Sequence, residues 1–231
     1  MKITKITDRT ILFTIPESPT SYVNLCLIMG KHHNFLIDTG VGESSVKAVL
    51  EYLGDSKKPI VAIITHAHWD HIFGNSALDG SLIVSHTLCR EIIDREWNKE
   101  IQDVIQEASR AYIDAEVHKC LPNLVFDSTL HFPEDGITLF HTPAHTADGI
   151  SIYDSVDKAL HTGDNFGVFD GVAYYWGEDL SDFERMIEAY KQYDFDICIS
   201  SHSEPQAKEV IALLEADLAK LRQKQKGLPT E

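Results

Sequence analysis

The first forty residues contain three short runs in which apolar positions alternate or cluster as they do in β-strands. The three runs are 11–15, 22–29 and 35–38. Turn-forming residues separate them around Pro16 and at Gly30. The pattern therefore predicts an antiparallel meander at the start of the chain.

A helical period begins at residue 44, where apolar residues recur three and four positions apart. It predicts a helix over 44–53, with Ser44 or Ser45 as the N-cap and Gly54 as the stop signal. The continuous apolar run 60–64 comes next and is typical of a strand that is buried on both faces.

The rest of the chain mixes helical and extended patterns. Helices are predicted at 72–77, 86–118, 180–190 and 205–221. Short strands are predicted at 124–126, 129–132, 137–141, 150–153, 159–162 and 195–200. Strands in runs, broken by helices in both halves, favour an α/β (α+β) fold of two packed sheets with helices outside.

No composition shift, linker or repeat divides the chain, so we expect a single domain over residues 1–231. The stretch 86–120 is expected to form a helical insertion or lid. Its predicted stripe includes Ile101, Val104 and Tyr112, and Trp97 and Tyr112 are candidates for substrate contact.

The chain is acidic, with 36 Asp and Glu against 20 Lys and Arg and a formal charge of -16. Such a field repels phosphate backbones and anionic membranes, so we expect a small-molecule substrate and neither a nucleic-acid nor a membrane partner. A homo-oligomer is compatible with the sequence. The absence of an export signal or a membrane-length apolar run, and four scattered cysteines without a Cys-x-x-Cys pair, favour a reducing, cytoplasmic location.

Candidate chemistry is concentrated in residues 66–71, which read His-Ala-His-Trp-Asp-His. They follow the 60–64 strand. Residues two apart in an extended segment share a face, so His66 and His68 point the same way, and the turn after them can aim Asp70 and His71 at a neighbouring point. This geometry suits two adjacent metal ions.

Further candidates lie where other predicted strands end. They are Asp38, His145, Asp164 and His202. Strand ends on one side of a sheet converge in space, and imidazole nitrogen and carboxylate oxygen are the ligands that zinc, iron and manganese accept. By contrast, His141 and His161 lie on strand segments before these ends, and we interpret both as structural histidines with satisfied hydrogen bonds.

The five signatures, in this order and at these separations, resemble those of the metallo-β-lactamase superfamily. The resemblance implies a four-layer αββα sandwich with metal ions at one edge between the sheets. It implies one ion held by His66, His68 and His145, a second held by Asp70, His71 and His202, Asp164 as the bridge between them, and Asp38 behind the ligands, orienting a histidine. The sequence departs from the family pattern in Pro-Ala-His-Thr-Ala-Asp around His145 and in Ser-Glu-Pro after His202, and neither departure removes a ligand.

Two cations that share a water lower its pKa and polarise an electrophile. We therefore expect a metal-dependent hydrolase that uses a hydroxide bridged between two divalent ions, with zinc first and iron or manganese as alternatives. Its expected substrate is a small-molecule ester, thioester or lactone. Asp70 is the candidate catalytic residue, as a general acid and base, and Trp69, Tyr174 and Tyr175 are candidates for substrate contact.

Two other activities stay open from the sequence. One is a mononuclear iron oxidoreductase of the persulfide dioxygenase type, which shares the His-x-His-x-Asp-His pattern. The other is phosphodiester hydrolysis at the same binuclear site.

Overall fold

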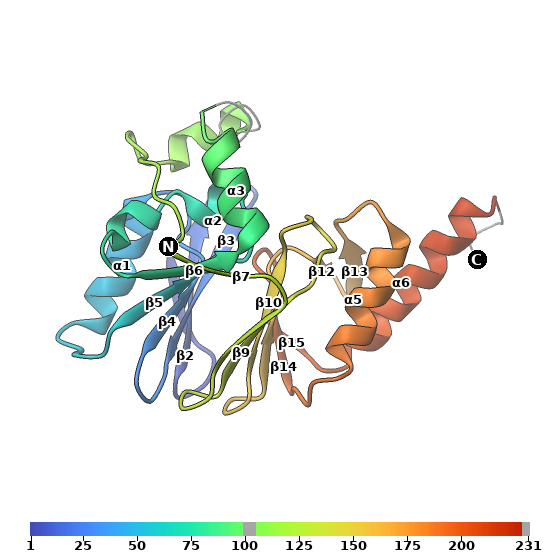
Figure 1. Ribbon diagram of the computed structural model, residues 1–231. Helices are drawn as coiled ribbons and strands as arrows, with labels where there is room; N and C mark the ends of the chain where they lie inside the picture. Colours follow the sequence, from blue (N-terminus) through green and yellow to red (C-terminus); the bar gives the residue numbers. More distant parts are fainter. Residues whose placement is uncertain (99–104, 228–231) are drawn as a thin grey trace.

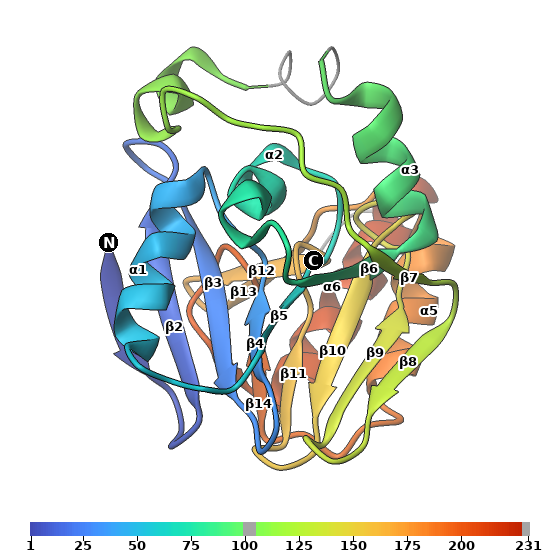
Figure 2. The ribbon, with the colours of Figure 1, turned by 60° about the vertical axis from the view of Figure 1, so that its left-hand side comes forward.

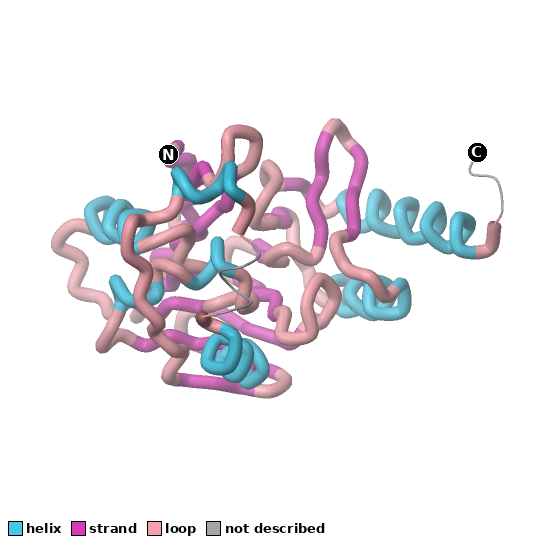
Figure 3. The backbone as a smooth tube through the Cα atoms, turned by 90° about the horizontal axis from the view of Figure 1, so that it is seen from above, coloured by secondary structure: helices cyan, strands magenta, loops and turns pink. Residues whose placement is uncertain are grey.

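Two β-sheets face each other in the computed structural model, and helices cover the outer face of each sheet (Figures 1 and 3). The structure describes residues 1–98 and 105–227. The layers follow the order helix, sheet, sheet, helix, which confirms the predicted αββα arrangement.

The first sheet contains seven strands. In order across the sheet they are β1 (Lys2–Lys5), β2 (Thr10–Pro16), β3 (Tyr22–Met29), β4 (Asn34–Ile37), β5 (Ile60–Ile63), β6 (Leu82–His86) and β7 (Leu124–Phe126). Strands β1 to β4 pair antiparallel, which confirms the meander, although β1 was not predicted. Strands β4 to β7 pair parallel, and α1 (Glu43–Leu53) forms the crossover between β4 and β5.

The second sheet contains six strands. In order they are β15 (Gln206–Ala207), β14 (Ile197–Ile199), β11 (Ala159–His161), β10 (Ile150–Asp154), β9 (Ile137–His141) and β8 (Thr129–Phe132). A separate hairpin, β12 (Phe166–Phe169) with β13 (Val172–Tyr175), was not predicted. Asp170 and Gly171 at its tip both have positive φ angles, of 51° and 75°, as tight hairpin turns require.

The helices fall into two groups (Figures 1 and 2). The first sheet carries α1, α2 (Trp69–Ile72), the 3₁₀ turn η1 (Asn75–Leu78) and α3 (Thr87–Glu96), with the 3₁₀ segment η2 (Glu107–Tyr112) above them. The second sheet carries α5 (Leu180–Tyr190) and α6 (Val210–Gln225). The bounds of α5 are those the sequence predicts, and the Asp179 side chain caps it by accepting a hydrogen bond from Ser181 N at 2.7 Å.

Apolar side chains on both faces of the strands explain the dense hydrophobic runs. On β2, Ile11, Phe13 and Ile15 pack toward the outer helices, and Leu12 packs toward the other sheet. One cluster therefore fills the space between the sheets, and a further cluster lies beneath the helices on each side.

The prediction of one helix over 86–118 is wrong. Helix α3 ends at Glu96, and residues 107–112 form η2, followed by irregular chain as far as β7. Ile101 and Val104 of the predicted stripe lie outside the described residues. Trp97 is buried beside Phe73 in the core rather than at a substrate surface.

A side chain from this irregular segment caps α1. Asp114 accepts hydrogen bonds from Ser44 N at 2.8 Å and Ser44 Oγ at 2.6 Å. Neither Ser44 nor Ser45 is the N-cap, which is Gly42. The capping prediction is wrong because the acceptor comes from a distant part of the chain.

Two other helix predictions shift in register. The helix expected at 72–77 begins earlier, as α2, and gives way to η1. The helix expected at 205–221 begins only at Val210, because residues 206–207 pair with β14. In the part of the chain that the structure describes, every helix is too short or too polar to cross a bilayer.

Candidate metal centre

The loops after five strands meet at one edge of the two sheets, uppermost in Figure 1. Asp38 follows β4, His66 follows β5, His145 follows β9, Asp164 follows β11 and His202 follows β14. Because β4 pairs parallel with β5, and β11 with β14, their carboxyl ends lie together. The fold thus brings the residues singled out in the sequence to one place.

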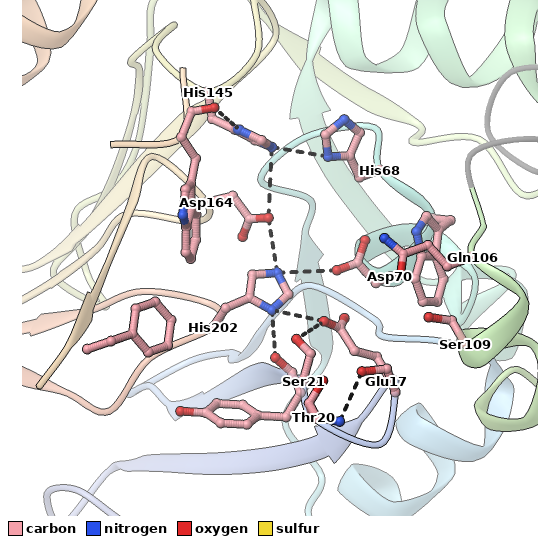
Figure 4. A pocket seen from close by; sticks show the side chains of 15 residues that line it. Glu17, Thr20, Ser21, His68, Asp70, Gln106, Ser109, His145, Asp164 and His202 are labelled. Carbon is pink, nitrogen blue, oxygen red and sulfur yellow. Dashed lines mark hydrogen bonds and ion pairs between the residues drawn. The ribbon is translucent and has the colours of Figure 1, made fainter. Parts of the chain in front are cut away.

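One cluster contains three histidines and a carboxylate. His68 Nδ1 lies 3.0 Å from His66 Nε2 and 3.2 Å from His145 Nε2. Asp164 Oδ2 lies 3.7 Å from His66 Nε2 and 3.9 Å from His145 Nε2. Figure 4 shows His68, His145 and Asp164 converging on one point.

A second cluster shares Asp164. Asp164 Oδ2 lies 3.3 Å from His71 Nε2 and 3.0 Å from His202 Nε2. Asp70 Oδ2 lies 3.2 Å and 3.3 Å from the same two nitrogens. In each cluster, one ligand atom from every residue lies within 4.8 Å of the others.

These separations fit a metal ion. Zinc bonds of 2.0–2.1 Å in a tetrahedron place neighbouring ligand atoms about 3.3 Å apart, and the separations reported for the two clusters range from 3.0 to 3.9 Å. Buried His71 Nε2 and Asp164 Oδ1 have no hydrogen-bond partner among the described residues. Both observations fit residues arranged around cations.

Four histidines are held so that Nε2 presents its lone pair to the clusters. In each case Nδ1 donates a hydrogen bond away from the clusters. The pairs are His66 with Thr65 Oγ1 (3.0 Å), His71 with Asp38 Oδ2 (2.8 Å), His145 with Trp176 O (3.1 Å) and His202 with Tyr22 O (2.6 Å). Neutral imidazole with a fixed tautomer is the form that binds metal.

Electrostatics differ between the clusters. Burial lowers the pKa of His66 well below its usual value and also lowers the pKa of His68. Burial also opposes the charged forms of His71 and His202, but the carboxylates of Asp70 and Asp164 outweigh it and raise both pKa values well above the usual range. The second cluster therefore attracts positive charge.

Asp38 lies behind the second cluster and is almost fully buried. Besides His71, it accepts hydrogen bonds from Thr65 N at 2.8 Å and Thr65 Oγ1 at 2.9 Å. Its φ of 60° lies in the left-handed region, which Asp tolerates better than most residues. This conformation, fixed where β4 ends, lets one carboxylate bridge the β5 loop and a cluster histidine.

Glu17 is a functional candidate that the sequence did not indicate. It lies in the turn after β2, is 8% exposed, and places Oε1 3.4 Å from His202 Nδ1. Ser21 Oγ donates to the same oxygen at 2.5 Å. Burial raises the pKa of Glu17 to about 7. Glu17 lies near the start of the chain, whereas His202 follows β14 near its end. A pattern among neighbouring residues therefore does not reveal this contact.

A pocket of about 460 Å³ opens above the clusters (Figure 4). Of the three candidates for substrate contact, Trp69 lines the pocket, whereas Tyr174 and Tyr175 do not. The Tyr175 ring stacks on Phe183, and its hydroxyl donates to Ala144 O at 3.0 Å. The aromatic side chains Phe169 and Trp176 line the pocket wall instead.

The two histidines interpreted as structural behave differently. His141 stacks on His86 with ring centres 4.0 Å apart, and its Nε2 donates to Ala147 O at 2.9 Å. His161 is fully buried, and neither ring nitrogen has a hydrogen-bond partner among the described residues. The expectation of satisfied hydrogen bonds is therefore wrong for His161, whose pKa burial lowers to about 3.

Comparison with known proteins adds to this geometry. Residues 19–202, more than half of the chain, match the family model described as the metallo-beta-lactamase superfamily. The chain belongs to the metallo-beta-lactamase superfamily. This membership confirms the resemblance drawn from the motifs, and the two clusters are able to hold metal.

Curated proteins with sequence similarity to this chain include several named acyl-coenzyme A thioesterase MBLAC2. The Homo sapiens protein is 26% identical over 194 residues, which span 71% of this chain and 67% of the relative. The Bos taurus protein is 27% identical over the same spans. Together with the family, these relatives support a hydrolase.

Solved structures of metallo-beta-lactamases share the fold of this chain. TMB-1 superposes with a TM-score of 0.74 at 17% identity, over 96% of this chain and 98% of that one. The metallo-beta-lactamase from Pontibacter korlensis has a TM-score of 0.71 at 22% identity, over the same shares. At these identities the likeness shows the fold alone.

Proposed function

We propose that this protein is a hydrolase that uses two metal ions to cleave a small-molecule ester, thioester or lactone, with thioesters as the leading class. The observation that carries the proposal is the position of Asp164, whose Oδ2 is shared by two clusters of histidine and aspartate. Similarity to proteins named acyl-coenzyme A thioesterases supports the thioester class.

Each cluster is assigned one ion in this proposal. His66, His68 and His145 would hold the first, Asp70, His71 and His202 the second, and Asp164 both. Zinc is the first choice, because histidine nitrogen and aspartate oxygen at these separations suit its tetrahedral preference.

Bound here, two divalent cations would supply a nucleophile from water near neutral pH and polarise the substrate carbonyl. The residues of the chain supply orientation and proton transfer. Asp38 and the Tyr22 carbonyl hold the Nδ1 hydrogens of His71 and His202, which keeps each Nε2 free to coordinate. Asp70 directs Oδ2 toward these histidines and lines the pocket, so we assign to its Oδ1 the proton that goes to the leaving group.

The pocket wall would hold the part of the substrate that does not react. Trp69 and Trp176 flank the clusters, and the Trp176 ring lies 5.7 Å from the His202 ring. Aromatic side chains at such a position exclude water from the reacting bond and contact apolar groups of the substrate.

The test is a panel of p-nitrophenyl esters, acyl thioesters, lactones and bis-p-nitrophenyl phosphate, assayed with metal-free and zinc-, manganese- or iron-loaded protein. We expect metal-dependent hydrolysis of carbonyl substrates and its loss in His68→Ala, with an unchanged circular dichroism spectrum. His118→Ala, which removes an exposed histidine far from the clusters, is the matched control.

Three results would contradict the proposal. They are full activity in His68→Ala, hydrolysis of the phosphodiester alone, and one iron per chain with oxygen uptake on a persulfide.

A further inference from the structure

Apart from the histidines of the clusters, the ionisable side chains that line the pocket are acidic. Glu17, Asp70 and Asp164 contribute acidic groups to its wall, and among the described residues no Lys or Arg lines it. Arg110 is the neighbour of the lining residue Ser109 in sequence, but it is exposed and does not line the pocket. Outside the cluster histidines, an anionic ligand therefore meets no lysine or arginine in the described wall.

The proposed metal ions would not supply a large positive field either. Asp38, Asp70 and Asp164 place three carboxylates in the clusters or directly behind them, and Glu17, whose pKa is about 7, adds a partly ionised fourth. These groups offset most of the charge of two divalent cations. The remaining positive charge would act most strongly on the reacting carbonyl, because the attraction falls with distance and salt screens it over about 8–10 Å.

The opposite part of the pocket wall is apolar. Phe169, at the end of β12, is 42% exposed and lines the pocket. Its ring lies 6.2 Å from the Trp176 ring, and Trp69 also lines the pocket. An exposed phenylalanine in a pocket wall indicates contact with an apolar ligand group.

Phosphate recognition requires arginine or lysine side chains or a helix N-terminus aimed at the phosphate. Coenzyme A carries three phosphate groups, whereas the thioester bond and acyl chain need only the clusters and an apolar wall. From the wall composition we infer that the substrate held in this pocket is an uncharged thioester or ester with an apolar acyl group, and that the described residues of the wall do not recognise the nucleotide of coenzyme A. This inference rests on the proposed function.

A matched pair of substrates tests the inference. Hexanoyl-N-acetylcysteamine and hexanoyl-coenzyme A contain the same acyl group and the same thioester bond, and differ in the charged nucleotide. We expect the neutral thioester to have a kcat/KM at least equal to that of the coenzyme A thioester. A preference of about tenfold or more for the coenzyme A thioester, lost at high salt, would overturn the inference.

A binding measurement without turnover tests this inference independently of the proposed function. The non-hydrolysable thioethers S-hexyl-N-acetylcysteamine and S-hexyl-coenzyme A can be titrated into the metal-loaded protein by calorimetry. Equal or tighter binding of the neutral thioether supports the inference even if neither thioester is hydrolysed, a result that would contradict the proposed function alone. Tighter binding of the coenzyme A thioether by about tenfold overturns the inference.

Two substitutions on one hairpin test the apolar wall. Phe169→Ser should raise KM for the hexanoyl thioester by about five- to tenfold with little change in kcat, because the acyl chain loses a contact made equally in the ground and transition states. Val172→Ser is the control, because Val172 pairs with Phe169, is 41% exposed and does not line the pocket. Equal KM values in the two variants would overturn the assignment of this wall.

Discussion

His161 offers a test of how burial controls protonation in this protein. Its cross-strand neighbours Ile152 and Ile199 lie in the cluster between the sheets, so its ring faces the same core. Neither ring nitrogen has a partner among the described residues, and burial lowers the pKa to about 3 from an ordinary 6.5. The folded protein therefore holds this imidazole neutral where the unfolded chain would bind a proton.

The sign and size of the effect follow from proton linkage. Between the two pKa values, the unfolded chain binds a proton at His161 that the folded protein does not, so stability falls as the pH is lowered. A full proton is worth about 1.4 kcal/mol per pH unit, so the loss from about pH 7 to about pH 5 is about 2 kcal/mol. His161→Leu removes this contribution and also removes two unsatisfied buried nitrogens.

The assay is urea unfolding of metal-free wild type and His161→Leu, followed by circular dichroism at both pH values. We expect the variant to be at least as stable near neutral pH, and its advantage to grow by about 2 kcal/mol at the lower pH. The cluster residues also bind protons in this range, but they are the same in both proteins and cancel in the difference. Parallel pH dependence in the two proteins would refute the reasoning.

Three further substitutions test individual contacts. Above the Glu17 pKa of about 7, Glu17→Gln should weaken metal binding about 10- to 100-fold, because it removes the negative charge beside His202. Calorimetric titration in that pH range checks this, with Glu204→Gln, which removes an exposed carboxylate, as the control. Asp38→Asn should lower the unfolding free energy of the metal-free protein by about 1–3 kcal/mol, because an amide donor replaces an acceptor oxygen; an unchanged urea midpoint would contradict it. Asp114→Ala should cost about 1 kcal/mol by uncapping α1, and a thermal midpoint equal to that of wild type would show that the contact does not stabilise the helix.

The sequence predicted the cluster residues and most of the strands, because both depend on local patterns. His66, His68, Asp70 and His71 lie within six positions, and the distant members follow strands whose ends converge in a sandwich. Any fold with these strands in these two sheets would bring them together. The order of strands and cluster residues along the chain was therefore sufficient to predict which residues form the two clusters.

The contacts that the sequence did not predict depend on tertiary structure. Glu17 reaches His202 through a turn, and Asp114 caps a helix seventy positions away in the sequence. The hairpin that carries Phe169 had a usable signal in the Asp-Gly pair at 170–171, which was not recognised as a tight turn. The helix expected at 86–118 failed because apolar spacing alone does not show where a helix ends.

Zinc titration of the metal-free protein tests the central claim most directly, since that claim is a pair of ions that share Asp164. We expect two zinc ions per chain for wild type, and weaker binding of both in Asp164→Ala with an unchanged circular dichroism spectrum. One ion per chain, or two ions bound with the wild-type affinity by Asp164→Ala, would contradict the two-metal site.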